Sequence, residues 1–330
     1  MKSVFGAGST LIFLSLISRE FGWDDRMPYR SIRSLEIETF GREEMLKAVA
    51  IVLCVITLAS AAKAETFRIE FLGASTTALD NPHDIKLGPD GKRLFVSDVD
   101  NDRVVVLDAD SLALLDHFGS DHQGGTHDVD FDKDGRLYVA DTHNGRVTIY
   151  EMAGNKGRLV GELSERIRGP EGVLVHPNGR IYVGAAWSNN LVVYENGKIV
   201  GELRGLSSPH DVEMTPDGDI WLADAGNDRM LLLTPGLQII KELSGPKYGF
   251  NGPRYQDVMP DGTLIVADKY THSLKIIAVD GALLQVIGTG QAAKGPGKFT
   301  TPEGVELKGD ILWIADSGND RIVKYRMTRR

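Results

Sequence analysis

The stretch Asn81–Asp108, NPHDIKLGPDGKRLFVSDVDNDRVVVLD, contains the pattern that decides the fold. It opens with a P-H-D-I tetrad, passes through the turn Asp90-Gly91, and continues as an apolar run, a polar D-x-x-N-x-R segment and a β-branched run. Short apolar runs rich in β-branched residues and bounded by Gly and Asp predict strands, and D-G between two of them predicts a tight hairpin. This stretch therefore predicts three antiparallel strands.

The pattern recurs in five further segments: Gly125–Tyr150, Gly169–Tyr194, Ser208–Leu233, Gly252–Ile277 and Thr301–Tyr325. The second tetrad residues stand at positions 83, 127, 171, 210, 256 and 303, a mean spacing of 44 residues. A fourth apolar run follows five of the six repeats, and the missing one, Phe67–Leu72 (FRIEFL), precedes the first. We therefore predict an all-β, six-bladed β-propeller of four-stranded blades, its ring closed by the N-terminal strand. The alternative, an open solenoid, would not need the displaced strand.

The first 64 residues are typical of targeting material. Residues 48–59 (AVAIVLCVITLA) form an apolar run that is too short to span a membrane, Lys47 precedes it, and Ala62-Lys63-Ala64 provides a small-x-small cleavage site. We predict a signal peptide at residues 45–64, an extension of doubtful status at 1–44, and a single propeller domain at 65–330. Residues 11–17 (LIFLSLI) offer a competing signal or a core fragment.

Charge and cysteine content limit the functional classes. Residues 65–330 contain 29 basic and 39 acidic residues, a net charge of −10, which argues against non-specific nucleic-acid binding. The only cysteine, Cys54, lies in the predicted signal, so the mature domain has no disulfide and no cysteine-based metal site. We expect a periplasmic or secreted protein whose mature domain does not insert into a membrane.

The tetrads predict a ring of side chains around one mouth of the central channel, because the innermost strands line that channel. Six residues form the predicted ring: His83, His127, Glu171, His210, Gln256 and Glu303. Imidazoles and carboxylates that converge on one axis suit a divalent metal, Zn²⁺ above all. We therefore expect His83, His127 and His210 to hold a metal, with Glu171 or Glu303 as a further ligand or partner. A structural Ca²⁺ held by backbone carbonyl oxygens is the alternative.

The loops around this mouth predict a substrate rim. Trp187, His143, Tyr255 and Gln256 are its candidate members. Tyr270 lies in a divergent loop (DKYTHS) and suits an acid, a base or a hydrogen-bond donor, and Arg254 stands just before the blade-five tetrad. Tyr270 and Arg254 are the candidate catalytic residues.

Other repeated polar residues favour a structural interpretation, because a residue needed in nearly every blade is expected to satisfy loop backbone groups. The set comprises Asp98, Asp141, Asp224, Asp268 and Asp316, the loop residues Asn101, Asn144, Asn227 and Asn319, and the tetrad residues Asp84, Asp128, Asp211 and Asp257. The repeated arginines, Arg103, Arg146, Arg229 and Arg321, are expected to pair between blades.

The blocks VSDVDNDRV, VADTHNGRV, LADAGNDRM and IADSGNDRI, with the P-x-D-V starts, resemble NHL repeats. Within that family, Pro82-His83-Asp84-Ile85 and Pro209-His210-Asp211-Val212 resemble a motif of peptidyl-α-hydroxyglycine α-amidating lyase, and Thr126-His127-Asp128 with VADTHNGR resembles a second. The resemblance implies a channel zinc held by histidines, and C–N cleavage of a carbinolamide with Tyr270 as base. The family's third histidine has no clear counterpart, its tyrosine loop is matched only loosely by DKY, and its disulfides are absent, which puts substrate and activity in doubt.

Three functional classes stay open at the level of sequence. The first is the metal-dependent lyase acting on a small molecule or peptide at the channel mouth. The second is a non-catalytic periplasmic binding or scaffold propeller whose rim docks a protein partner. The third is a lactonase or a streptogramin-type lyase, because one propeller scaffold serves many activities. Metal content and loss of activity with a chelator would separate the enzymes from the scaffold.

Overall fold

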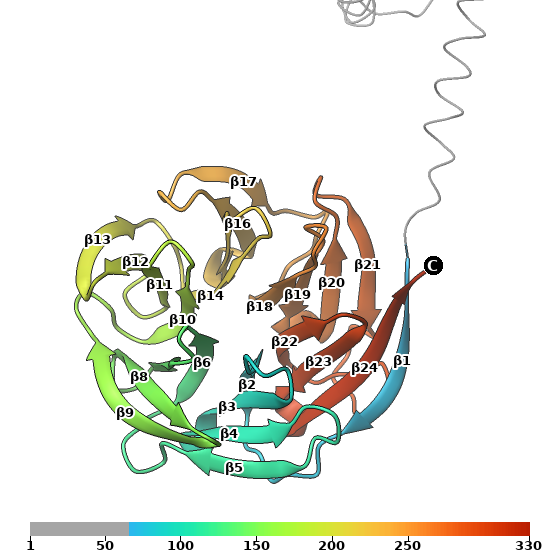
Figure 1. Cartoon of the computed structure of the whole chain (residues 1–330). Coiled ribbons are helices and arrows are strands. Elements are labelled where there is room, and N and C mark those ends of the chain that lie inside the picture. The colour runs from blue at the N-terminus through green and yellow to red at the C-terminus, as the bar shows by residue number, and fades with distance from the viewer. Residues whose placement is uncertain (1–65) are drawn as a thin grey trace, which may run out of the picture. The chain divides into compact units, whose positions relative to one another are not determined.

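The computed structural model describes residues 66–330, which form six four-stranded antiparallel sheets arranged around a central axis (Figure 1). The prediction of an all-β, six-bladed β-propeller is therefore confirmed. The predicted signal peptide and the preceding extension lie outside the described residues. Within residues 66–330, no helix has the length and apolar character that a membrane span requires.

In each blade, the strand named first below lines the central channel, and the other three follow outward in the order given. Blade 1 contains β2 (Pro82–Leu87), β3 (Arg93–Asp98), β4 (Arg103–Asp108) and β5 (Leu114–Phe118); blade 2 contains β6 (Thr126–Phe131), β7 (Leu137–Asp141), β8 (Arg146–Ala153) and β9 (Lys156–Leu163); blade 3 contains β10 (Pro170–Val175), β11 (Arg180–Ala185), β12 (Asn190–Glu195) and β13 (Lys198–Leu203). Blade 4 contains β14 (Pro209–Met214), β15 (Ile220–Asp224), β16 (Arg229–Leu233) and β17 (Ile239–Leu243); blade 5 contains β18 (Pro253–Val258), β19 (Leu264–Asp268), β20 (Ser273–Ile277) and β21 (Leu283–Gly288); blade 6 contains β22 (Pro302–Lys308), β23 (Ile311–Asp316), β24 (Arg321–Arg329) and β1 (Phe67–Ala74).

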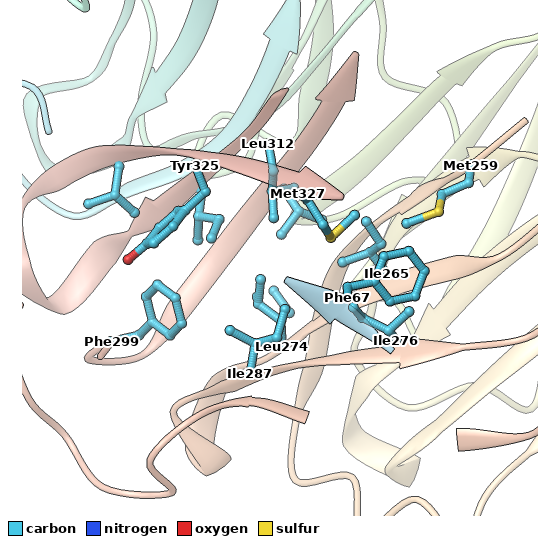
Figure 2. Packing of buried hydrophobic residues seen from close by; sticks show 14 residues of the cluster. Phe67, Met259, Ile265, Leu274, Ile276, Ile287, Phe299, Leu312, Tyr325 and Met327 are labelled. Carbon is cyan, nitrogen blue, oxygen red and sulfur yellow. The ribbon is translucent and has the colours of Figure 1, made fainter. Parts of the chain in front are cut away.

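The N-terminal strand closes the ring, as the sequence predicts. Strand β1 pairs with β24 in antiparallel register, Phe67 opposite Arg329 and Phe71 opposite Tyr325. Figure 2 shows Phe67 packed among Met259, Ile265 and neighbouring apolar residues between blades 5 and 6. The main chain of Phe67 also bonds to the Gln285 amide of β21, at 2.7 and 3.1 Å, so β1 joins the two blades.

Six hydrophobic clusters fill the spaces between neighbouring blades, one cluster at each interface. They form because alternate strand residues face alternate sides of a sheet, so each blade presents an apolar face to both neighbours. The Trp313 indole, for example, packs between blades 6 and 1 and donates its Nε1–H to the carbonyl oxygen of Ala109 at 3.0 Å. The core is thus a ring of interfaces that surrounds the channel.

The loops that follow the second strand of a blade are held in the same way, by hydrogen bonds of the repeated aspartates. In blade 2, Asp141 accepts the backbone N–H of Gly124 at 2.7 Å with one carboxylate oxygen and binds Arg146 at 2.7 Å with the other. Equivalent bonds recur at Asp98, Asp224 and Asp316, with Lys275 replacing the arginine at Asp268. The structural interpretation of these aspartates is confirmed. The expectation that the arginines pair between blades is wrong, because the adjacent strand places each one opposite its own blade's aspartate.

Candidate functional site

The register of the innermost strands defines the ring at the channel mouth. In every blade but the third, the residue that opens this strand lies opposite the loop aspartate, as Pro82 lies opposite Asp98 and Pro253 opposite Asp268. The next residue is the ring residue. The ring therefore consists of His83, His127, Glu171, His210, Arg254 and Glu303.

The assignment of Gln256 to this ring is a misalignment by two residues. Gln256 pairs with Val266, as Ile85 pairs with Val96, so it faces an interblade interface. Its side-chain amide bonds to the carbonyl oxygens of Asp211 and Trp221, both at 3.2 Å. The spacing between the ring residue and the following turn identifies the correct ring residue of blade 5. The ring residue precedes the turn Asp or Asn by seven positions in blades 1 to 5, and counting back from Asp261 gives Arg254.

Tyr255 is the floor of the mouth and is not part of a rim, contrary to the sequence-based prediction. Its side chain is fully buried, because it occupies the place that Asp84, Asp128 and Asp211 take in their own strands. Its hydroxyl lies 3.1 Å from the carbonyl oxygens of both His127 and Glu171. Burial raises the pKa of this phenol well above its usual value, so it stays protonated.

One small space of about 10 Å³ lies in the channel wall among residues that include Asp84, Asp128 and Asp211. A separate hollow of about 580 Å³ opens at the far end, next to the turns of blades 1 to 4, and no ring residue lines it. We place the candidate site at the ring, because the unpaired polar atoms described below lie there.

One half of the ring, in blades 3, 4 and 5, is a chain of charged contacts. The Nε2 atom of His210 contacts both the Glu171 carboxylate and the Arg254 guanidinium. Arg254 lies 4.0 Å from Glu171 and from Glu303, and its Nη2 donates to the Tyr270 hydroxyl at 3.4 Å. The two predicted catalytic residues, Arg254 and Tyr270, are therefore in contact with each other, and Arg254 also contacts His210.

The other half of the ring, in blades 6, 1 and 2, contains unpaired polar atoms. The His83 and His127 rings meet edge to face with centroids 4.5 Å apart, and His83 Nε2 lies 3.7 Å from Glu303 Oε1. Within residues 66–330, neither nitrogen of His83 and neither carboxylate oxygen of Glu303 has a hydrogen-bond partner, although Glu303 forms an ion pair with Lys269. Buried polar groups normally have partners, so these unpaired atoms make this half of the ring a candidate place for a bound ion, water or ligand.

The anchoring of His127 and His210 through Nδ1 turns Nε2 of each ring toward the other ring residues, where that of His210 contacts Glu171 and Arg254. His127 Nδ1 lies 2.9 Å from the Gly125 carbonyl oxygen, and His210 Nδ1 lies 2.8 Å from that of Ser208. A carbonyl oxygen can only accept, so Nδ1 carries the proton and Nε2 of the neutral ring carries a lone pair. Metal-binding histidines and catalytic bases are both held in this way.

Burial and neighbouring charges set the protonation states. Burial lowers the pKa of His83 and of His127, and their mutual repulsion lowers that of His83 further, so both rings are neutral at pH 7. Burial by itself would raise the pKa of Glu171, but the adjacent His210 and His127 lower it, so this carboxylate is ionised. Burial opposes the charge of Arg254, yet Glu303 and Glu171 raise the pKa of its guanidinium.

Three aromatic side chains stand above the ring. His143, Trp187 and Tyr270 occupy equivalent loop positions in blades 2, 3 and 5, and each packs on the glycine that opens its repeat: Gly125, Gly169 and Gly252. A Cβ atom on any of these glycines would collide with the aromatic ring. Trp187 stacks on His143 with centroids 5.9 Å apart, and His143 lies 6.4 Å from His127. The predicted rim residues Trp187 and His143 thus lie at the mouth.

The predicted metal site is not preformed. Among residues 66–330, no three His, Cys, Asp or Glu side chains are grouped closely enough to hold a metal ion. The two cations that the sequence-based analysis did not place in the ring, Arg254 and Lys269, lie against its two carboxylates. Lys269 directly precedes Tyr270 in the sequence. Its position in that divergent loop was the signal that could have placed Lys269 at the ring.

These features define a six-bladed β-propeller with a buried, titratable cluster at one mouth of a closed channel. The NHL repeat family matches residues 127–150, which make up most of blade 2. Blade 2 of this six-bladed β-propeller therefore contains an NHL repeat.

Solved structures with the same fold include two lyases. A streptogramin B lyase is 15% identical, with a TM-score of 0.57 and coverage of 79% of this chain and 87% of that one. A catalytically inactive histidine-to-alanine variant of virginiamycin B lyase from Staphylococcus aureus, solved with quinupristin, is 15% identical, with a TM-score of 0.58 and coverage of 79% and 99%. A Bacteroides thetaiotaomicron protein of unknown function is 15% identical, with a TM-score of 0.63 and coverage of 80% and 76%. Similarity at this identity establishes the fold alone.

Proposed function

We propose that this chain is an exported lyase whose reaction takes place at the ring. The observation that carries the proposal is the contact of His210 Nε2 with both the Glu171 carboxylate and the Arg254 guanidinium. An imidazole held between a carboxylate and a cation at the mouth of a channel suits general acid–base catalysis.

The proposed reaction is an elimination that breaks a C–N or C–O bond. The substrate displaces the Arg254 contact at His210 Nε2, and the Nε2 lone pair then takes a proton from a hydroxyl or an acidic carbon of the substrate. The released electron pair forms a double bond as the neighbouring C–N or C–O bond breaks. The Tyr270 hydroxyl supplies a proton to the departing nitrogen or oxygen, and the Arg254 guanidinium stabilises the negative charge that develops.

The histidine half of the ring offers donor atoms that suit a divalent metal, but within residues 66–330 they are not grouped around one point. His83, His127 and Glu303 would therefore have to move together, and Glu303 would exchange Lys269 for the ion. His83, with both nitrogens unpaired, His127, with Nδ1 anchored, and Glu303, with no hydrogen bond, are the residues that would hold it. A bound Zn²⁺ would lower the pKa of a coordinated hydroxyl group. We assign the other predicted ligands, His210 and Glu171, to proton transfer because they already contact each other and Arg254.

Two assays test the proposal. The purified protein is incubated with a peptidyl-α-hydroxyglycine and with quinupristin, and mass spectrometry identifies the products. His210→Gln is the test variant and the exposed Asp100→Ala is its control. Turnover of one substrate class that His210→Gln abolishes supports the lyase, whereas turnover that survives this change contradicts the role of His210. An inert protein that captures another protein through its rim would indicate the binding-scaffold alternative.

Elemental analysis tests the metal separately. We expect about one divalent ion per chain in protein purified without chelator, and its loss from His83→Ala with His127→Ala. Retention of that ion in the double variant would place the metal elsewhere. A structural Ca²⁺ on backbone carbonyl oxygens is one such site.

A further inference from the structure

The hollow of about 580 Å³ at the end of the channel opposite the ring, called the far hollow below, has the make-up of a ligand site. Its volume lies within the range of sites that bind small molecules. Blades 1, 2 and 4 supply charged residues from their innermost strands, namely Lys86, Asp130 and Glu213. Its apolar wall includes Phe131, Tyr138, Leu174, Ile181 and Met214. Apolar walls with a few convergent charged groups are typical of binding pockets.

The charged residues of the far hollow belong to a third layer of channel side chains, which the proposed reaction does not use. Each member lies three residues beyond a ring residue on an innermost strand, and two beyond the inner-layer position, so the strand alternation turns both toward the channel. The layer consists of Lys86, Asp130, Leu174, Glu213, Asp257 and Glu306. One lysine therefore stands among four carboxyl groups.

Lys86 is shared among these carboxyl groups. Its Nζ atom lies 2.8 Å from the Glu213 carboxylate and 3.6 Å from that of Asp130. Burial opposes its charge, but the surrounding carboxylates raise the pKa of Lys86 well above its usual value, so it stays charged. Lys86 also borders a second hollow of about 320 Å³, whose lining includes Asp257 and Glu306. A single cation thus faces carboxyl groups on two sides.

The carboxyl groups of this layer lack positive charge around them. Burial raises the pKa of Asp130 to about 6 and that of Asp257 to about 7, although Lys86 lowers both. Burial also raises the pKa of Glu306 well above its usual value. Without a second cation, the layer must either hold protons or carry excess negative charge near neutral pH.

The other charges around the far hollow are already paired. Arg136 binds Asp132 at 2.7 Å, and Lys133 binds Asp134 at 2.7 Å. His176 bonds to main-chain groups through both ring nitrogens, at 3.0 and 3.1 Å. The uncompensated charge of the hollow therefore lies at its inner end, where two carboxylates face one lysine.

We propose that the far hollow is a second ligand site, which binds a small primary amine, as its ammonium ion, attached to an apolar body. The ammonium group donates to the carboxylates of Asp130 and Glu213, which have further lone pairs to accept it. Their side chains are 10% and 19% exposed, so they are largely buried yet open to the hollow. The apolar body packs against Phe131, Leu174 and Met214. This site lies at the opposite end of the channel from the ring and does not depend on the proposed function.

Three probes of similar size and different charge test the proposal. They are 4-phenylbutylamine, the neutral 4-phenyl-1-butanol and the anionic 4-phenylbutyrate. Calorimetry above pH 7, where Asp130 is ionised, should detect the amine, with weaker binding of the alcohol and none of the carboxylate. Equal affinity for amine and alcohol, preference for the carboxylate, or no binding of the amine would each overturn the site.

A change at Glu213 identifies the acceptor. Glu213→Gln removes one negative charge and keeps the side-chain size, so amine binding should weaken roughly 10- to 100-fold, the range of one hydrogen bond to a charged group. Binding of the alcohol should not change, whereas damage to the fold would weaken both probes alike. Asp217→Asn, in the exposed turn of blade 4 outside the far hollow, should affect neither probe. An unchanged amine-to-alcohol ratio in Glu213→Gln would contradict the proposal.

Two further measurements apply even if Glu213→Gln does not fold. Phe131→Leu should weaken the amine and the alcohol alike, roughly 2- to 10-fold, because it removes the aromatic face of the wall. Amine affinity of the parent should fall between pH 7 and pH 5, as Asp130 and Asp257 take up protons, while the alkylammonium ion stays charged. Unchanged binding in Phe131→Leu, or an amine affinity that is independent of pH, would overturn the site.

A ring variant establishes which end of the channel binds the amine. Glu171→Gln alters a carboxylate of the ring and should retain the affinity of the parent for 4-phenylbutylamine. Loss of binding in Glu171→Gln but not in Glu213→Gln would place the amine at the ring and overturn the second site. None of these measurements needs turnover, so their outcome is separate from success or failure of the proposed lyase.

Discussion

The ring and the layer of side chains directly beneath it both consist of buried titratable groups, but they use them for opposite purposes. In the inner layer, Asp84, Asp128 and Asp211 each accept a backbone N–H from the next blade, at 3.3, 2.5 and 2.8 Å. In the ring, His83 and Glu303 lack such bonds within residues 66–330. Both layers are buried, so burial alone does not identify a site. The difference lies in whether the protein itself satisfies its polar atoms.

The largest expected effect belongs to the ring. His210→Gln should lower turnover by about 10²- to 10⁴-fold, the usual contribution of a positioned acid or base. Its melting temperature should stay close to that of the parent, because glutamine keeps a polar side chain at the same place. Steady-state kinetics and thermal unfolding measure the two quantities. If this variant lost stability together with activity, His210 would support the fold as the inner-layer aspartates do, and the contrast between the two layers would be wrong.

The inner layer should respond in the opposite manner. Asp128→Ala leaves the buried N–H of Val173 without its acceptor, so the free energy of unfolding should fall by about 1–3 kcal/mol. Asp128→Asn retains an oxygen at that place and should be close to the parent in chemical denaturation. Equal losses for Ala and Asn would mean that the carboxylate charge, not the hydrogen bond, is what stabilises this layer.

The channel wall below the inner layer, at Asp130 two residues beyond Asp128 in β6, should control stability against pH. Burial raises the pKa of Asp130 to about 6, partly offset by Lys86, so the folded chain holds a proton that the unfolded chain releases near pH 4. Stability should therefore decrease by about 1.4 kcal/mol per pH unit between about pH 4 and 6 on account of this group. Asp130→Asn should flatten the decline measured by denaturation at several pH values, and the exposed Asp134→Asn should not. A steeper decline in Asp130→Asn would reverse the sign assigned to this group.

The smallest expected effect lies at the boundary between the two layers. Tyr255→Phe removes one hydroxyl that bonds to two main-chain carbonyl oxygens, so the free energy of unfolding should decrease by about 1 kcal/mol. Turnover should change little, because this phenol does not face the substrate. An activity loss comparable to that of His210→Gln would assign Tyr255 to the reacting groups.

Much of the architecture could be predicted because it repeats. Six copies of one hydrophobic pattern specify six sheets, and the displaced run at Phe67–Leu72 specifies how the ring closes. The ring itself was predicted in five of its six places. Blade 5 was misassigned because Gln256-Asp257-Val258 imitates the H-D-V ending of other tetrads, while the fold aligns Pro253 with the earlier prolines. Backbone pairing decides this register, and side-chain similarity does not.

The contacts within the ring could not be predicted, because they depend on side chains from loops far apart in the sequence. Lys269 reaches Glu303 from another blade, and Arg254 contacts partners in blades 3, 4 and 6. The match between Trp187 and Gly169 is visible in the sequence only when both repeats are already superposed. Such matches arise from packing at one mouth, which a linear pattern does not encode.

The Tyr255 floor has a kinetic consequence. Because the buried Tyr255 bridges the main chains of His127 and Glu171 beneath the ring, a molecule at the ring is expected to arrive and depart past the rim. Both products of the proposed cleavage would then leave through the opening that the next substrate needs. The slower product then excludes that substrate while it remains, so accumulating product acts as a competitive inhibitor. The rim through which a substrate enters would therefore also control the rate of product release.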